Sequence, residues 1–114
     1  MRNTDIADAF DELADRLALT DTKPFRYAAY RRAADLFREL GESVQLLASE
    51  GRLLELDGVG PAIADKTTQL CETGTFDALE QARVDVADTL LELTRIPGIG
   101  PATARTIYAA SGEQ

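Results

Sequence analysis

A nine-residue phrase rich in glycine and proline occurs twice in this chain of 114 residues. The first copy, LDGVGPAIA, begins at Leu56, and the second, IPGIGPATA, begins at Ile96, so each contains a Gly-x-Gly-Pro-Ala core. Glycine accepts backbone conformations with positive φ and lets another molecule approach the main chain closely. Proline suits the first position of a helix, because its φ is already helical and it has no amide hydrogen to satisfy. Each copy therefore predicts a tight turn, here called the first hairpin (residues 56–61) or the second hairpin (residues 96–101), that opens into a helix.

The first turn of each predicted helix has backbone amides without an intrahelical partner, and the helix dipole adds partial positive charge there. An anion such as phosphate can bind to these amides. A single Gly-x-Gly is often only a turn, whereas two agreeing copies are much stronger evidence of a shared role. The doubled phrase resembles the helix-hairpin-helix motif, which binds the DNA backbone without sequence preference. Its candidate DNA-binding positions are Gly58, Gly60 and Ala62 in the first copy and Gly98, Gly100, Ala102 and Thr103 in the second.

Composition excludes several other classes of protein. A single cysteine, Cys71, excludes an internal disulfide, and the absence of histidine excludes zinc fingers and histidine-based catalytic triads. The sequence contains no apolar run long enough to span a membrane, and its amino terminus lacks the apolar core of a signal peptide. We therefore expect a cytoplasmic protein with no membrane partner, associated with the nucleoid in a prokaryote.

The formal net charge of −8 argues against DNA binding when the chain is taken as a whole. The distribution of the charge changes that interpretation, because residues 23–38 carry five basic residues against Asp35 alone. The positive charge is thus concentrated in one predicted helix. We expect binding to depend more on oriented backbone amides than on a basic surface.

The hydrophobic pattern predicts an all-α fold, a small helical bundle with two helix-hairpin-helix motifs and no strand. Asn3 or Thr4 can cap a first helix, and a second helix begins at Pro24 and is ended by Gly41. The chain is expected to turn from about Thr75. The apolar stripe of the first helix is Ile6, Phe10, Leu13 and Leu17, and the later predicted helices cover residues 43–50, 61–73, the segment around Val86, Leu90 and Leu93, and residues 101–110.

The order of these segments resembles the amino-terminal region of family X DNA polymerases. The resemblance covers nearly the whole chain and is closest to the bacterial and archaeal branch, relatives of DNA polymerase beta. It depends on an acidic first helix, the segment PFRYAAYRRAA at residues 24–34, the segment ETGT at residues 72–75, and the two hairpins. It implies a lyase-type domain at residues 1–82 that holds the 5′ end of a gap. It also implies that residues 83–114, which contain the second hairpin, begin the next subdomain.

Nucleotide transfer in this family requires carboxylates in a palm domain that bind two metal ions, and Mg²⁺ would need that palm. We therefore expect no polymerase activity from these residues and expect the chain to be a piece of a longer nucleotidyltransferase.

The resemblance implies a catalytic role for Lys66, which could attack the C1′ aldehyde of a 5′-deoxyribose phosphate, form a Schiff base and expel the phosphate by β-elimination. Such a lysine has to be neutral part of the time. Tyr30 matches a tyrosine that helps to hold the 5′ phosphate, and Arg26, Arg31 and Arg105 are further DNA-binding candidates. The alternative is an ordinary exposed lysine. The sequence departs from the family pattern at Phe25, Ala62, Asp65 and Ala78, so lyase activity is expected to be weak or absent.

The family also places a monovalent cation, K⁺ or Na⁺, in each hairpin, held by backbone carbonyls. By position these carbonyls would be those of Leu54, Leu56 and Val59 in the first hairpin and of Thr94, Ile96 and Ile99 in the second.

Three functions remain open at this point. The first is a DNA-binding module of a base excision repair polymerase, a monomer that favours gapped or 5′-phosphorylated DNA without reading base sequence. The second is a 5′-deoxyribose-phosphate or AP lyase that uses Lys66. The third is a non-catalytic protein-interaction module, in which the hairpins only connect helices.

Overall fold

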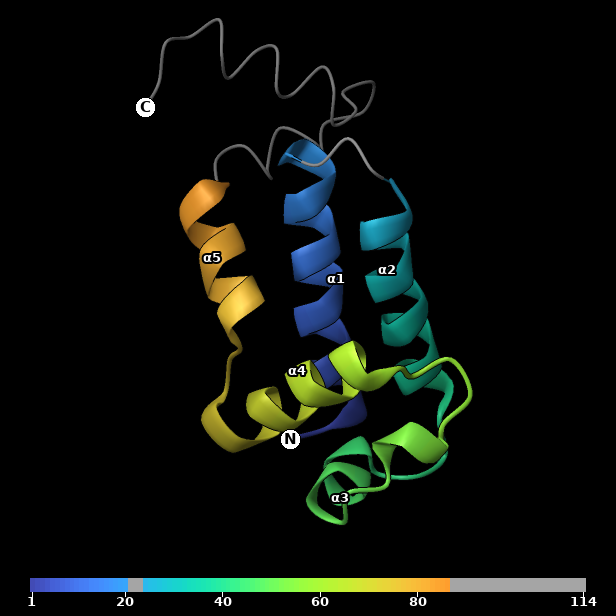
Figure 1. Cartoon of the computed structure of the whole chain (residues 1–114). Coiled ribbons are helices and arrows are strands. Elements are labelled where there is room, and N and C mark those ends of the chain that lie inside the picture. Colours follow the sequence, from blue (N-terminus) through green and yellow to red (C-terminus); the bar gives the residue numbers. More distant parts are fainter. Residues whose placement is uncertain (21–23, 87–114) are drawn as a thin grey trace, which may run out of the picture.

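The computed structural model describes residues 1–20 and 24–86, and this part of the chain folds entirely into helices and loops, without a strand (Figure 1). The prediction of a small all-α bundle is confirmed. The second hairpin and the predicted helix at residues 101–110 lie outside the described residues. The elements in chain order are α1 (Asn3–Thr20), α2 (Pro24–Glu39), α3 (Val44–Ser49), the 3₁₀ turn η1 (Leu53–Glu55), α4 (Pro61–Thr73) and α5 (Asp77–Asp85).

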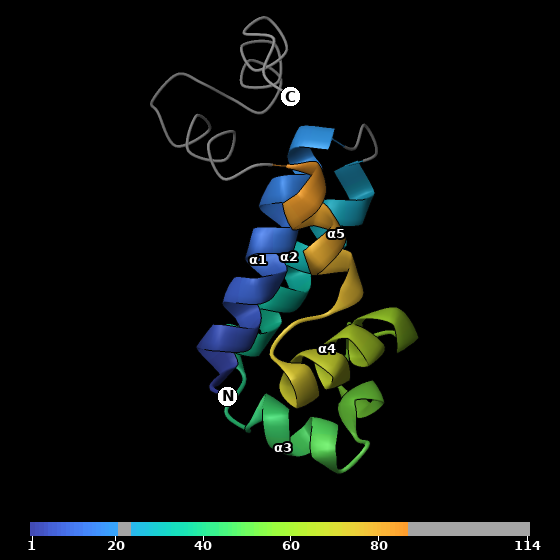
Figure 2. The ribbon, with the colours of Figure 1, turned by 90° about the vertical axis from the view of Figure 1, so that its left-hand side faces the viewer.

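The first helix, α1, packs against both α2 and α5 and lies between them in Figure 1, while Figure 2 shows the same helices turned by 90°. The chain runs along α2 in the direction opposite to α1 and along α5 in the same direction. The shorter α3 and the helix α4 lie across the end of the bundle where α1 begins. The helix that follows the first hairpin is therefore packed crosswise against a three-helix body.

Phe10 of α1 lies at the centre of the hydrophobic core. Its ring centroid is 5.3 Å from that of Phe76, 5.8 Å from that of Phe37 and 6.2 Å from that of Tyr30. The predicted apolar stripe of α1 is confirmed, because Ile6, Phe10 and Leu13 are fully buried and Leu17 packs against the same cluster. One aromatic residue thus connects α1 to α2 and to the segment that precedes α5.

The predicted boundaries of α3 and α4 agree with the structure. The Ser43 hydroxyl caps α3 by accepting a hydrogen bond of 3.2 Å from the Leu46 amide. Pro61 begins α4, and Gly74 ends it with a φ of +86°, in the left-handed conformation that glycine tolerates best. Proline and glycine therefore mark the start and the stop of α4 as the sequence predicted.

The predicted turn at about Thr75 agrees with the structure, in which residues 74–76 separate α4 from α5. The helix that follows was not predicted: α5 begins at Asp77 and buries Leu79 and Ala82 against the bundle. Val86 was expected inside a helix, yet it is buried in extended conformation directly after α5 (φ −128°, ψ 107°). Only two of the apolar residues of α5 are buried and Val84 is exposed, so its periodicity is weak, and packing against α1 stabilises it. The predicted domain boundary at residue 82 falls inside this helix, and the division itself stays a prediction.

Asn3 does not cap α1 as expected. Its side-chain oxygen accepts a hydrogen bond of 2.8 Å from the Val44 amide, and its amide group donates to the carbonyls of Leu40 (3.3 Å) and Glu42 (2.8 Å). The side chain therefore bonds backbone groups around the loop between α2 and α3 rather than those of its own helix. Local sequence does not reveal such a long-range contact.

Candidate nucleic-acid interface

The first hairpin is a tight turn built on two glycines with different conformational requirements. Gly58 has a φ of +92°, whereas Gly60 is extended (φ −89°, ψ 177°), a conformation that any residue adopts. Between them Val59 is buried, and its amide donates a hydrogen bond of 3.2 Å to the Leu56 carbonyl. A Cβ added at either glycine would meet no atom within 4 Å. The turn therefore needs a glycine at Gly58, while the missing side chain at Gly60 leaves an open surface.

This open surface displays unpaired backbone donors. No side chain caps the start of α4, and the first amide with a helical bond is that of Ala64, which donates to the Gly60 carbonyl at 2.9 Å. Gly58, Gly60 and Ala62, three of the candidate DNA-binding residues, are exposed. Among the described residues, the amides of Gly58, Gly60, Ala62 and Ile63 have no acceptor. This arrangement of uncapped amides at a helix N-terminus suits an anion.

Lys66 and Tyr30 come together from different elements. Lys66 lies in α4 about one and a half turns after Pro61 and is half-buried. Its Nζ lies 5.8 Å from the centroid of the Tyr30 ring on α2. Tyr30 is itself half-buried and stacks on Phe10 with an interplanar angle of 28°. The two candidate residues therefore lie close together in the structure, and their role stays a prediction.

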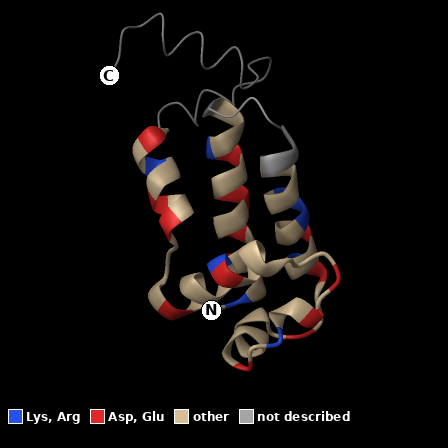
Figure 3. Ribbon diagram, viewed as in Figure 1, with Lys and Arg blue, Asp and Glu red and all other residues tan. Residues whose placement is uncertain are grey.

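Arg31 points to a different neighbour. Its guanidinium lies 2.7 Å from Asp15 and 4.0 Å from Asp11, both on α1. Arg38 makes ion pairs of 2.6 Å with Asp8 and with Asp11, and the hydrogen bonds that it donates to these two carboxylates raise the pKa of Arg38. Figure 3 shows the acidic residues of α1 beside the basic residues of α2. The positive segment predicted at residues 23–38 is therefore partly neutralised by α1.

The other predicted site residues are the cation ligands of the first hairpin, Arg26, and the positions at and around the second hairpin. Leu54 is exposed, and the Leu56 carbonyl accepts the hydrogen bond from the Val59 amide. The cation site at the first hairpin stays a prediction. The Arg26 backbone belongs to α2, and its side chain is not among the described ones. The positions Thr94, Ile96, Gly98, Ile99, Gly100, Ala102, Thr103 and Arg105 lie outside the described residues.

Sequence reasoning missed an ion-pair cluster on the opposite side of α1, in which only Arg16 is buried. Glu12 accepts hydrogen bonds from Arg83 Nε at 2.7 Å and from Arg16 Nε at 2.9 Å. The Arg83 hydrogen bond is the main cause that lowers the pKa of Glu12. Arg16 is buried and also donates to the Val86 carbonyl. The spacing of four between Glu12 and Arg16 was a visible signal, whereas the Arg83 contact, 71 residues away, was not.

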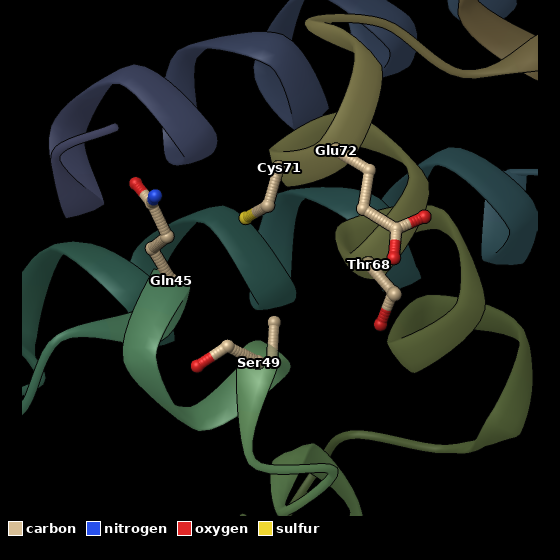
Figure 4. Close-up of a pocket in the computed structure, with 6 residues that line it drawn as sticks. Gln45, Ser49, Thr68, Cys71 and Glu72 are labelled. Carbon is tan, nitrogen blue, oxygen red and sulfur yellow. The ribbon is translucent and has the colours of Figure 1, made fainter.

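A small hollow of about 130 Å³ lies between α3 and α4. Figure 4 shows Gln45 and Ser49 of α3 on one side and Thr68, Cys71 and Glu72 of α4 on the other. Burial raises the pKa of the Cys71 thiol, so this group stays protonated at neutral pH. The hollow therefore offers no reactive thiolate.

The described part of the chain contains no cluster of acidic or sulfur ligands for a metal ion, and none of its helices is long and apolar enough to cross a membrane.

Comparison with known protein families shows which family contains this hairpin. A family described as a helix-hairpin-helix domain matches residues 1–76, which is more than half of the chain. The chain belongs to the helix-hairpin-helix family. A second match, described as a SAM-like helix-hairpin-helix tandem, covers residues 50–113 and so includes both hairpins.

Sequence identity to a known protein adds to the family match. The protein described as DNA polymerase/3′-5′ exonuclease PolX, from Bacillus subtilis (strain 168), is 24% identical over 112 residues. The match covers 98% of this helix-hairpin-helix chain but only 19% of the relative, so the chain spans about a fifth of the length of that protein. The resemblance to the amino-terminal region of family X DNA polymerases is thus confirmed.

Proposed function

We propose that the chain is a sequence-independent DNA-binding module of a family X DNA polymerase, which grips gapped DNA or 5′-phosphate ends in DNA repair as a monomer. The observation that carries this proposal is the group of amides at Gly58, Gly60, Ala62 and Ile63, which have no acceptor among the described residues and lie at the uncapped start of α4. A helix start of this kind accommodates a phosphate group. Membership in the helix-hairpin-helix family and a relative described as a DNA polymerase support DNA as the source of that phosphate.

The charge distribution supports contact through the backbone rather than through basic side chains. The chain has a net charge of −8, and Arg31 and Arg38 are engaged by carboxylates of α1. A phosphate held by amides is recognised without regard to base identity, because base edges are read by side chains or strands placed in a groove. Binding should therefore be independent of sequence.

A substitution at Gly60 tests this proposal without straining the fold. Gly60→Asp places a carboxylate at the N-cap position of α4, where it accepts a hydrogen bond from the Ala62 or Ile63 amide and repels phosphate. Stability should stay the same or rise by a few tenths of a kcal/mol, while DNA affinity falls about ten-fold or more. Fluorescence anisotropy with 5′-phosphorylated gapped DNA measures the affinity, and urea unfolding measures the stability.

The matched control is Gly41→Asp, which adds the same charge at another exposed glycine with open space around its Cβ. It should keep most of the affinity. If both variants bind as tightly as the original chain, the amides of the first hairpin are not the contact. If the original chain fails to bind any DNA even at low salt, the protein-interaction alternative replaces the proposal. Equal affinity for 5′-phosphorylated and 5′-hydroxyl gaps would remove the end preference alone.

A second candidate function, a 5′-deoxyribose-phosphate or AP lyase, is favoured by the placement of Lys66 beside Tyr30. In this reaction the neutral Lys66 amine adds to the C1′ aldehyde and water leaves, which gives an imine. Loss of the C2′ proton then breaks the C3′–O bond and leaves a 5′ phosphate on the downstream strand. Water finally hydrolyses the imine and restores the free lysine. These steps need no metal ion.

Borohydride trapping tests the lyase candidate directly. Reduction of the imine on pre-incised abasic DNA should give a covalent adduct that is absent in Lys66→Ala and present in Lys23→Ala, the control at the other lysine of the chain. An adduct that persists in Lys66→Ala would assign the chemistry to another amine. If the original chain binds DNA but gives no adduct, only the binding function stands.

The proposal extends to a monovalent cation, K⁺ or Na⁺, on the carbonyls of Leu54, Leu56 and Val59. Among the described residues, the carbonyls of Leu54 and Val59 accept no hydrogen bond, so both are free to bind a cation. Replacing K⁺ by choline at constant ionic strength should weaken DNA binding. Unchanged affinity in choline would exclude a contribution of the cation.

A further inference from the structure

We propose that Tyr30 is a positioning residue, whose ring face holds the Lys66 amine in place at the DNA-binding end of α4. The Lys66 Nζ lies 5.8 Å from the ring centroid, inside the roughly 6 Å range of cation–π attraction. This inference rests on the proposed lyase function for its catalytic consequence, whereas the contact itself exists without DNA.

The ring that receives Lys66 is anchored in the core. Tyr30 stacks on Phe10 at 6.2 Å, and Phe10 is fully buried between Phe37 and Phe76. A ring packed in this way has little freedom to turn about its own side-chain torsions. The position of the Lys66 amine is therefore linked through Tyr30 to the centre of the bundle.

No carboxylate competes with the ring for Lys66. Among the described residues Lys66 makes no ion pair, although Asp65 precedes it in the chain. A carboxylate partner would favour the ammonium form, which is not nucleophilic, whereas an aromatic face orients the group without a full opposite charge. The ring face therefore orients the Lys66 amine without a salt bridge among the described residues.

The role of the ring can be separated from that of the Tyr30 hydroxyl. Tyr30→Phe keeps the ring face and the stacking on Phe10, while Tyr30→Leu removes the ring and keeps an apolar side chain. If Tyr30 acts only by bonding a phosphate through its hydroxyl, both variants lose function equally. If the ring positions Lys66, Tyr30→Phe behaves like the original chain and Tyr30→Leu does not.

Lysine-specific NMR is suited to this test because the chain has only two lysines, Lys23 and Lys66. Reductive methylation with ¹³C-formaldehyde labels these amines and the amino terminus and keeps their charge. A Lys66→Arg variant identifies the Lys66 signal. In the DNA-free protein this signal should show a ring-current shift in the original chain and in Tyr30→Phe, and should move toward the Lys23 signal in Tyr30→Leu. The matched control, Tyr27→Leu, removes another tyrosine of α2 and should leave the signal in place.

The catalytic consequence is measured by the rate of borohydride trapping at saturating DNA. Tyr30→Phe should keep the rate, and Tyr30→Leu should lower it about ten-fold or more, with a smaller change in DNA affinity. A Lys66 signal that is the same in Tyr30→Leu and in the original chain would overturn the proposal, as would a Phe variant that loses as much activity as the Leu variant. If no adduct forms in the original chain, the lyase function fails, and the NMR comparison still decides whether Tyr30 positions Lys66.

Discussion

Glu12 is the residue on which the contact between α1 and α5 depends most directly. It receives two hydrogen bonds from Arg83, at 2.7 and 2.8 Å, and one from Arg16, which is itself buried. A carboxylate bonded by two guanidinium groups strongly favours its ionised form. The pKa of Glu12 is accordingly lowered from its ordinary value of 4.5, chiefly by Arg83. The folded state therefore prefers Glu12 ionised more strongly than the unfolded chain does.

This preference predicts a pH dependence of stability. Because the pKa of Glu12 is lower in the folded state, its contribution to the free energy of unfolding is complete above pH 4.5 and is lost as the pH falls through the folded value. Glu12→Gln should lower the free energy of unfolding by about 1 to 3 kcal/mol at neutral pH and by less in acid. Urea unfolding at about pH 7 and about pH 3.5 measures both values.

Glu39→Gln serves as the control, because Glu39 is an exposed carboxylate of α2 that makes no ion pair with the described residues. It should change stability little at either pH. A Glu12→Gln variant whose deficit is as large in acid as at neutral pH would show that the pair does not act through the charge of Glu12.

Sequence alone pointed to candidate residues that belong to a strong motif or to a segment that carries the family resemblance. Lys66 follows the first hairpin by a few residues, and Tyr30 lies in the segment that carries the family resemblance. Arg31 was also chosen, but Asp15 on α1 binds its guanidinium, and no feature of the helix containing Arg31 predicts that partner. The pairing of Glu12 with Arg83 was missed for the same reason, since the fold, not local sequence, brings these two residues together.

At the scale of elements, α4 is defined by the residues at its two ends. Pro61 fixes its first turn, and Gly74 ends it in a left-handed conformation, with its amide donating to the Leu70 carbonyl at 2.8 Å. Such residues act locally, which is why the boundaries of α3 and α4 could be predicted. The helix α5 lacks comparable signals, because Phe76 precedes it and no side chain caps it. Its existence depends on burying Leu79 and Ala82, which only the assembled bundle provides.

The stop signal of α4 leads to a prediction about Gly74. Gly74→Ala should lower the free energy of unfolding by about 1 to 2 kcal/mol, because an alanine is strained at a φ of +86°. Gly41→Ala is the matched control, since Gly41 has no positive φ and equally open space around its Cβ. It should be neutral or slightly stabilising, because alanine restricts the unfolded chain. Thermal unfolding followed by circular dichroism compares the two variants, and equal effects would show that the strain at Gly74 is relieved elsewhere.

At the scale of the whole molecule, acidic and basic residues that are separate in sequence lie side by side in space. The excess of basic residues at 23–38 suggested a positive surface, but Asp8, Asp11 and Asp15 of α1 lie against it and bind Arg31 and Arg38. A sum of charges along a segment cannot include partners that the fold supplies. The described bundle therefore presents few basic side chains for phosphate.

This charge distribution predicts a weak dependence of DNA affinity on salt. Each phosphate neutralised by a basic side chain adds about 0.9 to the slope of log K against log salt concentration, so few such contacts give a slope no steeper than about −3. Anisotropy titrations over a series of KCl concentrations measure the slope. A slope steeper than about −6 would mean that basic side chains, not backbone amides, dominate the binding.

The contact between Glu12 and Arg83, 71 residues apart, also sets an order of events during synthesis. Helix α1 leaves the ribosome first, yet Phe76 and Arg83, which complete its packing, are made much later. Until then the side of α1 that faces α5 stays uncovered, and contacts of such long range form slowly. Helix α1 is thus made well before the residues of α5 that complete its packing, and nascent chains halted before residue 83 would expose the surface that α5 covers.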